Sequence, residues 1–375
     1  MEKKSLRIIV SGGGTGGHIF PAISIANALK EIQPDVEILF VGAEGKMEME
    51  KVPSAGYKIV GLPVAGFQRK LSIKTFTFFY KLLKSMLKAR RVIKDFKPDA
   101  VVGVGGYASG PILKTAQRNG KPTLIQEQNS YAGVTNRLLA KKAKAICVAY
   151  EGMEKYFPAD KIIMTGNPVR QDLVNLDSKK EEARKYFNVS EGQKVILVLG
   201  GSLGAKTLNA SLMGYMKEIS ELNDTTLIWQ TGKLYHADIK KELEGFDAKN
   251  VRLYDFITRM DLAFSISDLI VSRAGAGTIS ELCLVGKPTI LIPSPNVSED
   301  HQTKNAKALV NKNAAIMIND LSAPKELVVV AFELLKNNEK SAELSNNIKK
   351  LALPNAARVI AEKVLELANP YPSVP

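Results

Sequence analysis

Two stretches of the chain share one pattern, in which an apolar run is followed by a glycine-rich turn and then by a helix-forming segment. The first reads IIVSGGGTGGHIFPAISIANAL from residue 8, and the second reads VILVLGGSLGAKTLNASLMGYM from residue 195. A continuous apolar run is typical of a strand in a parallel sheet, because helices cover such a sheet on both faces. The repeated pattern therefore predicts two doubly wound, Rossmann-like α/β domains, each beginning with a glycine turn.

The remaining apolar runs extend both series of strands. A chain of 375 residues is longer than a single hydrophobic core usually supports, which also indicates two domains. We predict strands at Leu6–Val10, Val36–Val41, Ala100–Val104, Thr123–Gln126, Ala145–Val148, Lys194–Leu199, Thr226–Gln230, Asp268–Ser272 and Pro288–Ile292. We expect an N-terminal domain over residues 1–166 and a C-terminal domain over 167–353, with a hinge near TGNPVR at 165–170. Residues 323–367 are helical by pattern, and a last helix, at about 354–370, is expected to pack back on the first domain.

Composition places the chain among soluble globular proteins, with 45% hydrophobic and 24% charged residues. Two cysteines make neither a disulfide framework nor a cysteine metal cage, which fits a reducing compartment. No apolar stretch approaches the roughly 20 residues of a membrane-spanning helix, and MEKKSLRIIV lacks the features of a signal peptide. We therefore expect the chain to stay on the side of the membrane where it is made.

The net charge of +14 is unevenly distributed. Residues 1–166 contain 26 Lys and Arg against 13 Asp and Glu, whereas the rest of the chain is nearly balanced. A basic surface on the first domain predicts an anionic partner. Nucleic acid, anionic lipid and a phosphorylated substrate all remain open on this observation.

The first glycine turn is a candidate anion site. Residues 11–17 lie between a predicted strand and a predicted helix, where free backbone N–H groups and the helix dipole favour a negative charge. Gly12, Gly14 and Gly17 also satisfy the dinucleotide pattern G-x-G-x-x-G, with Glu44 in the place of a ribose-binding acid. This signal for a dinucleotide is weak, because so glycine-rich a run fits many patterns by chance.

The second turn resembles the phosphate loop of NTPases without matching it. Between Gly200 and Thr207 the sequence follows G-x-x-x-x-G-K-[ST] except that Ala205 replaces the last glycine. The predicted strand at Asp268–Ser272 does not end in an aspartate that could bind magnesium. An NTPase is therefore the weaker interpretation.

Polar residues that follow the predicted strands are candidate ligand contacts. Glu281 lies in the first turns of a helix, where a carboxylate is equally explained by the helix dipole. Gln302 and Asn305 lie one helical turn apart and could both face a ligand, and residues 127–129 (EQN) follow a strand, with a solvated loop as the alternative. His18 directly follows the first glycine turn, although a lone histidine is more often structural than catalytic.

Known metal and hydrolase motifs are absent from the sequence. Three histidines and two scattered cysteines offer no zinc-binding spacing, and neither a D-x-D pair nor a G-x-S-x-G elbow occurs. The sequence therefore indicates neither a zinc site nor a carboxylate-held metal on a diphosphate, and no metal or cofactor is predicted.

The segment from residue 69 to residue 97 is strongly basic, with ten Lys or Arg and one acid. Apolar residues recur within it at helical spacing, namely Phe76, Phe79, Tyr80, Leu83, Met86 and Leu87. Lysines repeat every seven residues on the opposite side, namely Lys74, Lys81 and Lys88. We favour a helix at an anionic membrane surface, with a solvated domain helix and a nucleic-acid surface as alternatives.

Seven motifs in series resemble the MurG family of GT-B glycosyltransferases, and together they cover essentially the whole chain. They are GGGTGGHIFP at 12–21, GVGGYASGP at 103–111, EQN at 127–129, TGNPVR at 165–170, GGSLGA at 200–205, RAGAGTISE at 273–281 and DHQTKNA at 300–306. The resemblance implies two Rossmann-like domains facing a cleft. It also implies transfer of N-acetylglucosamine from UDP-N-acetylglucosamine to undecaprenyl-diphosphate-linked muramyl pentapeptide, which turns lipid I into lipid II for peptidoglycan.

The resemblance also implies roles for individual residues. His18 is the family's histidine at the reaction centre, and the main chain of Ile257 meets the uracil. Glu281 is expected on ribose or sugar hydroxyls, Gln302 on the sugar and Ser202 on the diphosphate. The other donor contacts that it implies are Thr15, Gly16, Gly17, Asn129, Arg170, Ala276, Gly277, Thr278, Ile279 and Ser280.

The expected reaction is a single displacement with inversion and without a metal, in which the muramyl 4-hydroxyl attacks the anomeric carbon and UDP leaves. The membrane-facing residues expected are Lys74, Phe76, Phe79, Lys81, Leu83 and Lys88. The chain is thus expected to lie peripherally on the cytoplasmic face of the inner membrane, with anionic lipid as a partner and nucleic acid excluded. The alternatives are a GT-B transferase with another acceptor and a basic module that only binds.

Overall fold

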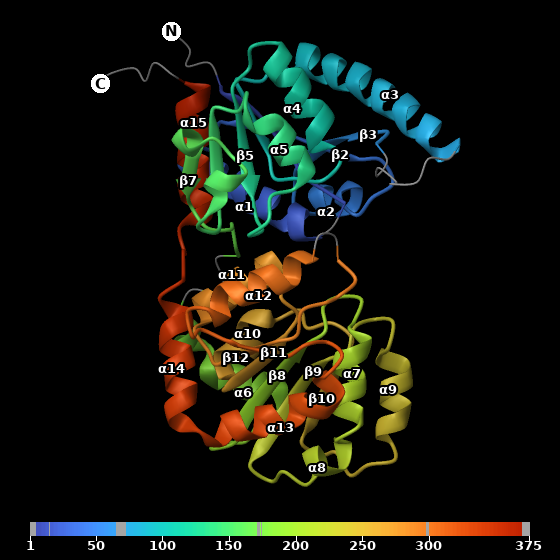
Figure 1. Cartoon of the computed structure of the whole chain (residues 1–375), viewed down its shortest axis with the longest axis vertical. Coiled ribbons are helices and arrows are strands. Elements are labelled where there is room, and N and C mark those ends of the chain that lie inside the picture. Colours follow the sequence, from blue (N-terminus) through green and yellow to red (C-terminus); the bar gives the residue numbers. More distant parts are fainter. Residues whose placement is uncertain are drawn as a thin grey trace. The chain divides into compact units, whose positions relative to one another are not determined.

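Figure 1 shows the computed structural model of the chain, which describes residues 5–14, 16–64, 73–170, 173, 175–297 and 300–369. Only the backbone is described for residues 73–79. The first of two compact units contains the described residues up to Val169 and those from Asn355 onward, and the second is Arg170–Pro354. Each unit is a parallel sheet between helices, so the predicted pair of doubly wound domains is confirmed.

The sheet of the first unit has seven parallel strands, and its order reverses beside β1. Strands β2 and β3 lie on one side of β1, while β4 begins the series on the other side. In sheet order the strands are β3 Lys58–Leu62, β2 Glu37–Ala43, β1 Arg7–Ser11, β4 Ala100–Gly103, β5 Thr123–Glu127, β6 Ala145–Val148 and β7 Ile162–Met164.

Successive residues of β1 enter different cores, because side chains alternate across a sheet. Ile8 and Val10 pack with α1 and α15, whereas Ile9 packs with α3, α4 and α5 on the opposite face. The C-terminal helix therefore belongs to the core of the first unit (Figure 1). The helices are α1 Gly16–Ile32, α2 Glu48–Ser54, α3 Ile73–Phe96, α4 Ser109–Arg118, α5 Val134–Ala140 and α15 Ala356–Ala368.

The second unit has six parallel strands in the same arrangement, with β8 as the counterpart of β1. The order reverses between β8 and β11, which pair from Leu269 opposite Ile196 to Ser272 opposite Leu199. In sheet order the strands are β10 Val251–Tyr254, β9 Thr225–Gln230, β8 Lys194–Leu199, β11 Leu269–Ser272, β12 Thr289–Leu291 and β13 Ile316–Met317.

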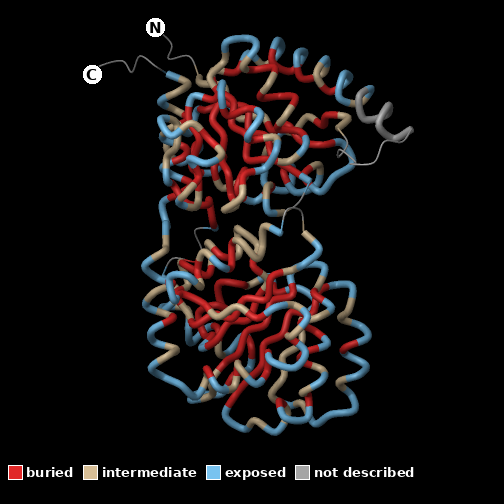
Figure 2. Tube along the Cα trace, in the orientation of Figure 1, coloured by how far each residue is buried: buried red, intermediate tan, exposed pale blue. Residues whose placement is uncertain are grey.

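Two cores also enclose this second sheet, and its central strands are buried in Figure 2. Leu197 packs on the side of α6, α10, α11 and α12, whereas Val198 packs on the side of α7, α8 and α13. The helices are α6 Lys180–Phe187, α7 Lys206–Met213, α8 Met216–Ser220, α9 His236–Leu243, α10 Met260–Ile266, α11 Ala276–Val285, α12 His301–Val310, α13 Ala323–Lys336 and α14 Asn338–Lys349.

A charged cluster ties α10 to the beginning of the second unit. The buried carboxylate of Asp261 accepts hydrogen bonds from Arg259 Nε at 3.0 Å and from Lys179 Nζ at 2.9 Å. Arg259 also pairs with Glu182 of α6 at 3.0 Å. The hydrogen bonds from Arg259 and then from Lys179 hold the pKa of Asp261 well below its usual range despite its burial. The cluster is structural, because each charge is paired within it.

Candidate functional site

The carboxyl ends of the central strands identify a candidate ligand site in each unit. In open α/β sheets a ligand binds beyond these ends, where the strand order reverses and the two adjoining turns diverge. In the first unit the reversal lies between β1 and β4, so its turns are those from Gly12 and from Val104. In the second unit it lies between β8 and β11, so the turns begin at Gly200 and at Arg273.

The two turns of the first unit are packed closely against each other. A Cβ added to Gly12 would lie 2.2 Å from Cγ2 of Val104, and one added to Gly106 would lie 2.3 Å from the carbonyl oxygen of Gly13. Ser109 at the start of α4 donates to the carbonyl of Ser11 at 3.0 Å and joins the two turns again. The glycines therefore permit close contact between two backbone segments.

His18 lies in the first turn of α1, against the second of these turns. A Cβ on Gly105, whose φ is +99°, would lie 2.8 Å from both Cδ2 and Nε2 of the imidazole. His18 is half-buried, whereas Phe20, two residues after it, and Tyr107, two residues after Gly105, are exposed. Helix α1 begins at Gly16, so the expected contacts Gly16 and Gly17 form its first turn. Thr15 lies outside the described residues.

The carboxylate of Glu127, at the end of β5, accepts hydrogen bonds from the loop and helix that follow it. Oε2 accepts from the Gly133 N–H at 3.0 Å and from Asn136 Nδ2 at 2.8 Å, and Oε1 accepts from the Asn129 N–H at 3.1 Å. Burial raises the pKa of Glu127, and these hydrogen bonds oppose the rise. Glu127 therefore shapes the loop that carries Asn129, and this role was not apparent from the EQN motif.

The first turn of the second unit leaves its tip exposed. Ser202 and Leu203 at the tip are exposed, and Lys233 N–H donates to the carbonyl of Ser202 at 3.2 Å. Gly204, with φ +95°, packs so tightly that a Cβ would lie 2.3 Å from the carbonyl oxygen of Thr231. Helix α7 begins immediately afterwards at Lys206. The turn thus presents backbone groups at a helix N-terminus, which is the arrangement that suits an anion.

Arg170 and Glu281, which the sequence nominates separately, form an ion pair. Arg170 Nε lies 2.9 Å from Glu281 Oε1, and the guanidinium side chain is 44% exposed while the carboxylate side chain is 19% exposed. Glu281 is on α11, whose N-terminal residues from Ala276 to Ser280 are partly exposed apart from Ile279. The side chain of Ile279 is buried in the core, so only its backbone is available to a ligand.

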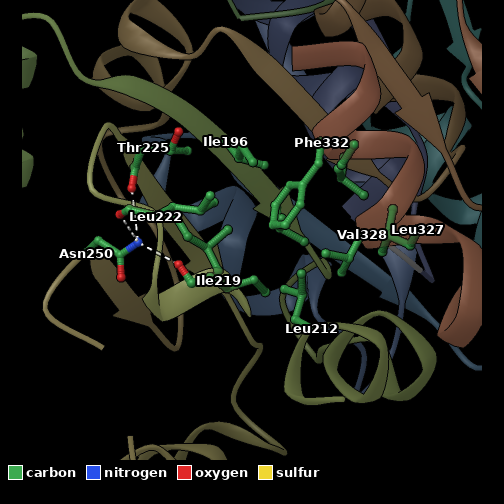
Figure 3. A pocket seen from close by; sticks show the side chains of 13 residues that line it. Ile196, Leu212, Ile219, Leu222, Thr225, Asn250, Leu327, Val328 and Phe332 are labelled. Atoms are coloured by element: carbon green, nitrogen blue, oxygen red, sulfur yellow. Dashed lines mark hydrogen bonds between the residues drawn. The ribbon is translucent and has the colours of Figure 1, made fainter. Parts of the chain in front are cut away.

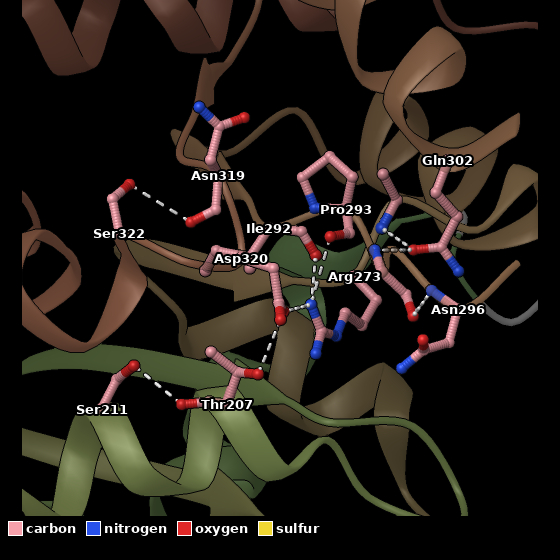
Figure 4. Close-up of polar contacts among 12 residues, drawn as sticks. Thr207, Ser211, Arg273, Ile292, Pro293, Asn296, Gln302, Asn319, Asp320 and Ser322 are labelled. Atoms are coloured by element: carbon pink, nitrogen blue, oxygen red, sulfur yellow. Dashed lines mark hydrogen bonds and ion pairs between the residues drawn. The ribbon is translucent and has the colours of Figure 1, made fainter. Parts of the chain in front are cut away.

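Gln302 and Asn305 of α12 both bind the turn that follows β11. Gln302 Oε1 accepts from the Ala274 N–H at 3.2 Å and from the Ser294 N–H at 2.9 Å, as Figure 4 shows. Asn305 is buried, and its Nδ2 donates to the carbonyl of Ala274 at 3.5 Å. The Gln302 amide therefore has its N–H groups left for a ligand, and Asn305 serves the turn.

Arg273 holds the same turn from the other side, by contacts that sequence reasoning missed. Its Nη1 pairs with Asp320 and donates to the carbonyl of Ile292 at 3.0 Å (Figure 4). Asp320 also accepts from the Thr207 hydroxyl at 2.8 Å. The hydroxyl of Thr207, the residue that would bind magnesium in a phosphate loop, thus donates its hydrogen bond to another side chain of the protein.

The expected uracil contact has one of its two main-chain groups already engaged. Ile257 N–H donates to Oε1 of the buried Gln230 at 2.9 Å. The side chain of Ile257 is buried in the core. The carbonyl of Ile257 is therefore the group that remains for a base.

An internal cavity of the second unit is not part of this site. It measures about 20 Å³, and aliphatic and aromatic side chains from the sheet, α8 and α13 line most of it (Figure 3). Asn250 at its margin donates from Nδ2 to the carbonyls of Ile219, Leu222 and Thr225. A space of this size holds at most about one water molecule, so it is a packing gap.

The described part of α3 has an exposed apolar face beside its basic one. Ser85, Ala89, Val92 and Ile93 are buried against the unit, whereas Tyr80, Leu83 and Leu87 are exposed. Lys81 is half-buried. The side chains of three predicted membrane-facing residues, Lys74, Phe76 and Phe79, lie outside the described ones.

One of the predicted membrane-facing lysines has a partner within the unit. Lys88 Nζ lies 2.7 Å from Glu44 Oε1. Glu44, which the dinucleotide hypothesis assigned to a ribose, is thus paired with a lysine of α3 at the surface of the unit. The described residues include no group of three His, Cys, Asp or Glu arranged to hold a metal ion, and none of the described helices has the length and apolarity to cross a membrane.

Comparison with known sequence families matches both units. Residues 8–148 match the glycosyltransferase family 28 N-terminal domain, and residues 195–362 match the glycosyltransferase family 28 C-terminal domain. The crystal structure of MurG of Acinetobacter baumannii superposes with a TM-score of 0.77 at 29% identity, covering 97% of this chain and 100% of that one.

Curated relatives cover the same length at higher identity. A protein of Bacteroides thetaiotaomicron named UDP-N-acetylglucosamine--N-acetylmuramyl-(pentapeptide) pyrophosphoryl-undecaprenol N-acetylglucosamine transferase is 59% identical over 368 residues, which are 98% of this chain and 99% of the relative. A relative of the same name from Cytophaga hutchinsonii is 53% identical over 368 residues, covering 98% of each chain.

Proposed function

The chain belongs to glycosyltransferase family 28, and on this premise we propose that it transfers N-acetylglucosamine from UDP-N-acetylglucosamine to undecaprenyl-diphosphate-linked muramyl pentapeptide. The observation that carries the proposal is the 59% identity, along practically the full length of both chains, to a transferase named for that reaction. The product is the lipid-linked disaccharide precursor of peptidoglycan.

The nucleotide sugar binds to the second unit in this proposal. Its diphosphate meets the exposed tip at Ser202, where backbone N–H groups and the N-terminus of α7 favour negative charge. The Arg170–Glu281 pair presents a cation for phosphate beside a carboxylate that accepts hydrogen bonds from hydroxyls. The carbonyl of Ile257 takes the N–H of the uracil, and the amide N–H groups of Gln302 meet the sugar.

The small residues at the start of α11 let the donor approach the backbone. Ala276, Gly277, Thr278 and Ser280 are partly exposed there. A Cβ on Gly277 would have no neighbour within 4 Å, so the helix surface is open at this point. Close approach at a helix N-terminus allows N–H groups to stabilise charge that develops on the leaving diphosphate.

The chemical step requires a base, and His18 is proposed for it. The muramyl 4-hydroxyl oxygen forms a bond to the anomeric carbon as the bond from that carbon to the UDP oxygen breaks, with inversion. The hydroxyl proton passes to a ring nitrogen of the imidazole, which can act as an acceptor in its neutral form. Gly16, Gly17 and Asn129 lie at the same edge of the first sheet as His18 and are assigned to substrate contacts.

The first unit is proposed to rest on the anionic cytoplasmic face of the membrane through α3. Its exposed Tyr80, Leu83 and Leu87 enter the headgroup boundary, while the basic residues around them bind anionic lipid. Lys84 Nζ lies 4.7 Å from the centroid of the Tyr80 ring, so a cation for lipid phosphate lies beside an aromatic ring for the headgroup boundary. Such a position would bring the reaction to an acceptor that is itself anchored in lipid.

Release of UDP from UDP-N-acetylglucosamine tests the function directly. We expect release only when a lipid I analogue is present, and the same rate with a chelator, because backbone donors replace a metal. Release with other acceptors at an equal rate would instead identify a different transferase of the same fold. Loss of activity under the chelator would contradict the metal-independent reaction.

A further inference from the structure

A buried carboxylate lies directly beneath the first glycine turn. Glu48, the first residue of α2, has 0% of its surface exposed. Its Oε2 accepts from the Gly14 N–H at 3.0 Å, and its Oε1 accepts from the Ala43 N–H at 2.9 Å. One side chain thus joins the turn after β1 to the end of β2.

The neighbouring glycines are required by this carboxylate. A Cβ on Gly13 would lie 2.1 Å from Glu48 Oε1, and a Cβ on Gly42 would lie 2.5 Å from Glu48 Cγ. Neither glycine could be replaced without displacing the side chain. Part of the glycine pattern that suggests a bound anion is therefore explained by an anion that belongs to the protein.

The described part of the second unit shows no such arrangement. Among the described residues, no carboxylate accepts a hydrogen bond from the turn at Gly200–Gly204, whose backbone bonds run from Gly200 N–H to Gln230 and from Gly204 N–H to Gly201. The two turns look alike in sequence but differ in what their amides bind. The first has an internal carboxylate, and the second has an exposed tip.

The carboxylate is mechanically linked to the proposed base. Gly13 contacts Glu48 on one side and Gly106 on the other, where a Cβ added to Gly106 would lie 2.3 Å from the Gly13 carbonyl oxygen. Gly105, which precedes Gly106, contacts the His18 ring. A buried carboxyl group without its donors would be costly, so the turn cannot move while Glu48 keeps its hydrogen bonds to Gly14 and Ala43. The position of Glu48 therefore determines the position of the turn that precedes His18.

We propose that Glu48 is a positioning residue for the transfer reaction, and that its carboxylate replaces an external anion at the first glycine turn. The turn then serves to hold His18 against Gly105 and leaves the neutralisation of the leaving diphosphate to the second unit. This inference rests on the proposed function.

The test compares Glu48→Ala with Glu50→Ala, a change on the same helix at a side chain that is 75% exposed. Glu48→Ala should lower kcat for UDP release about ten-fold or more while the donor KM changes less than about two-fold, because a loosened turn misplaces His18. Formate should restore part of the lost kcat by occupying the vacated carboxylate position. Glu50→Ala should behave as the parent protein with and without formate.

Thermal unfolding supplies a readout that does not depend on activity. Formate should raise the unfolding midpoint of Glu48→Ala, whereas chloride at the same ionic strength should not. For the parent protein, formate and chloride should give the same unfolding midpoint. A parent protein that releases no UDP would overturn the proposed function, while the formate effect on unfolding would still report on Glu48.

Glu48→Gln keeps the shape of the side chain but can accept at only one of its two terminal atoms. We expect this variant to fold, to have a reduced kcat and to be insensitive to formate, because the position is filled. Parental kcat in Glu48→Gln, or in a folded Glu48→Ala, would overturn the positioning role. A loss of kcat in Glu48→Ala that formate leaves unchanged would overturn the replacement of an external anion.

Discussion

Replacing Gly105 by alanine should show how the position of His18 affects kcat, apart from any effect on the stability of the fold. The new Cβ would lie 2.8 Å from Cδ2 and Nε2 of the imidazole, which is closer than real Cβ contacts. The ring must therefore move by several tenths of an ångström or more. The φ of +99° adds backbone strain of about 1–2 kcal/mol for any residue with a side chain.

The matched control is Gly120→Ala, at the end of α4. Its φ of +70° carries a similar backbone penalty, but nothing lies within 4 Å of the added Cβ. Both variants should lose about 1–2 kcal/mol of unfolding free energy. Only Gly105→Ala should lose activity, by about ten- to one hundred-fold in kcat, because a displacement approaching 1 Å at a catalytic group costs about 100-fold.

The measurements are denaturant unfolding for stability and UDP release at saturating donor for kcat. A loss of 100-fold corresponds to about 2.7 kcal/mol of transition-state stabilisation, which is well outside the error of either assay. A parental kcat in Gly105→Ala would refute a role for His18 at the position that the structure gives it. Equal losses in both would instead mean that strain, and not the imidazole, limits the reaction.

Three further outcomes follow from other parts of the chain. Asp261→Asn should lower the unfolding free energy by about 1–3 kcal/mol, because Lys179 loses this carboxylate and Arg259 keeps Glu182 alone in the cluster. Urea titrations of the variant should show less acid sensitivity, because the depressed pKa of Asp261 gives the parent stability above about pH 4 that falls away at lower pH. Burial raises the pKa of Cys147 to about 12, so its thiol should resist iodoacetamide at pH 8 until the protein unfolds. The contribution of this thiol to the unfolding free energy should fall as the pH rises from about 9 towards 12. Replacing Leu83 and Leu87 by serine should weaken sedimentation with anionic vesicles, whereas Leu138→Ser, at a residue that is 74% exposed on α5, should not; equal binding by all variants would contradict the membrane face.

The strands that were predicted from apolar runs are the interior ones. All nine predicted strands are present, from β1 to β12, because a strand with helices on both faces is a nearly continuous apolar run. The four strands outside the prediction, β3, β7, β10 and β13, each lie at an edge of a sheet. Two of these edge strands contain a charged residue, Lys58 in β3 and Arg252 in β10. The other two, β7 and β13, have only three and two residues, so their apolar runs are too short to indicate a strand.

The local motifs that predict the candidate site follow the carboxyl ends of strands in the structure. The glycine turns, His18 and the segment before Glu281 follow β1, β8 and β11, and the chain direction of a parallel sheet brings such turns to one edge. The family was recognisable from the same motifs and is confirmed by full-length relatives. These features are local in sequence, so no tertiary information was needed to find them.

Tertiary structure alone decided which groups of each turn are occupied. Glu48 is 34 residues from Gly14, and Glu281 is 111 residues from Arg170, so neither contact has a local sequence signal. Folding brings them together because hydrogen-bonding groups removed from water must find partners wherever the packed chain places them. The order of residues thus specified two similar glycine turns, whereas the tertiary structure placed a buried carboxylate beneath the first and left the tip of the second exposed.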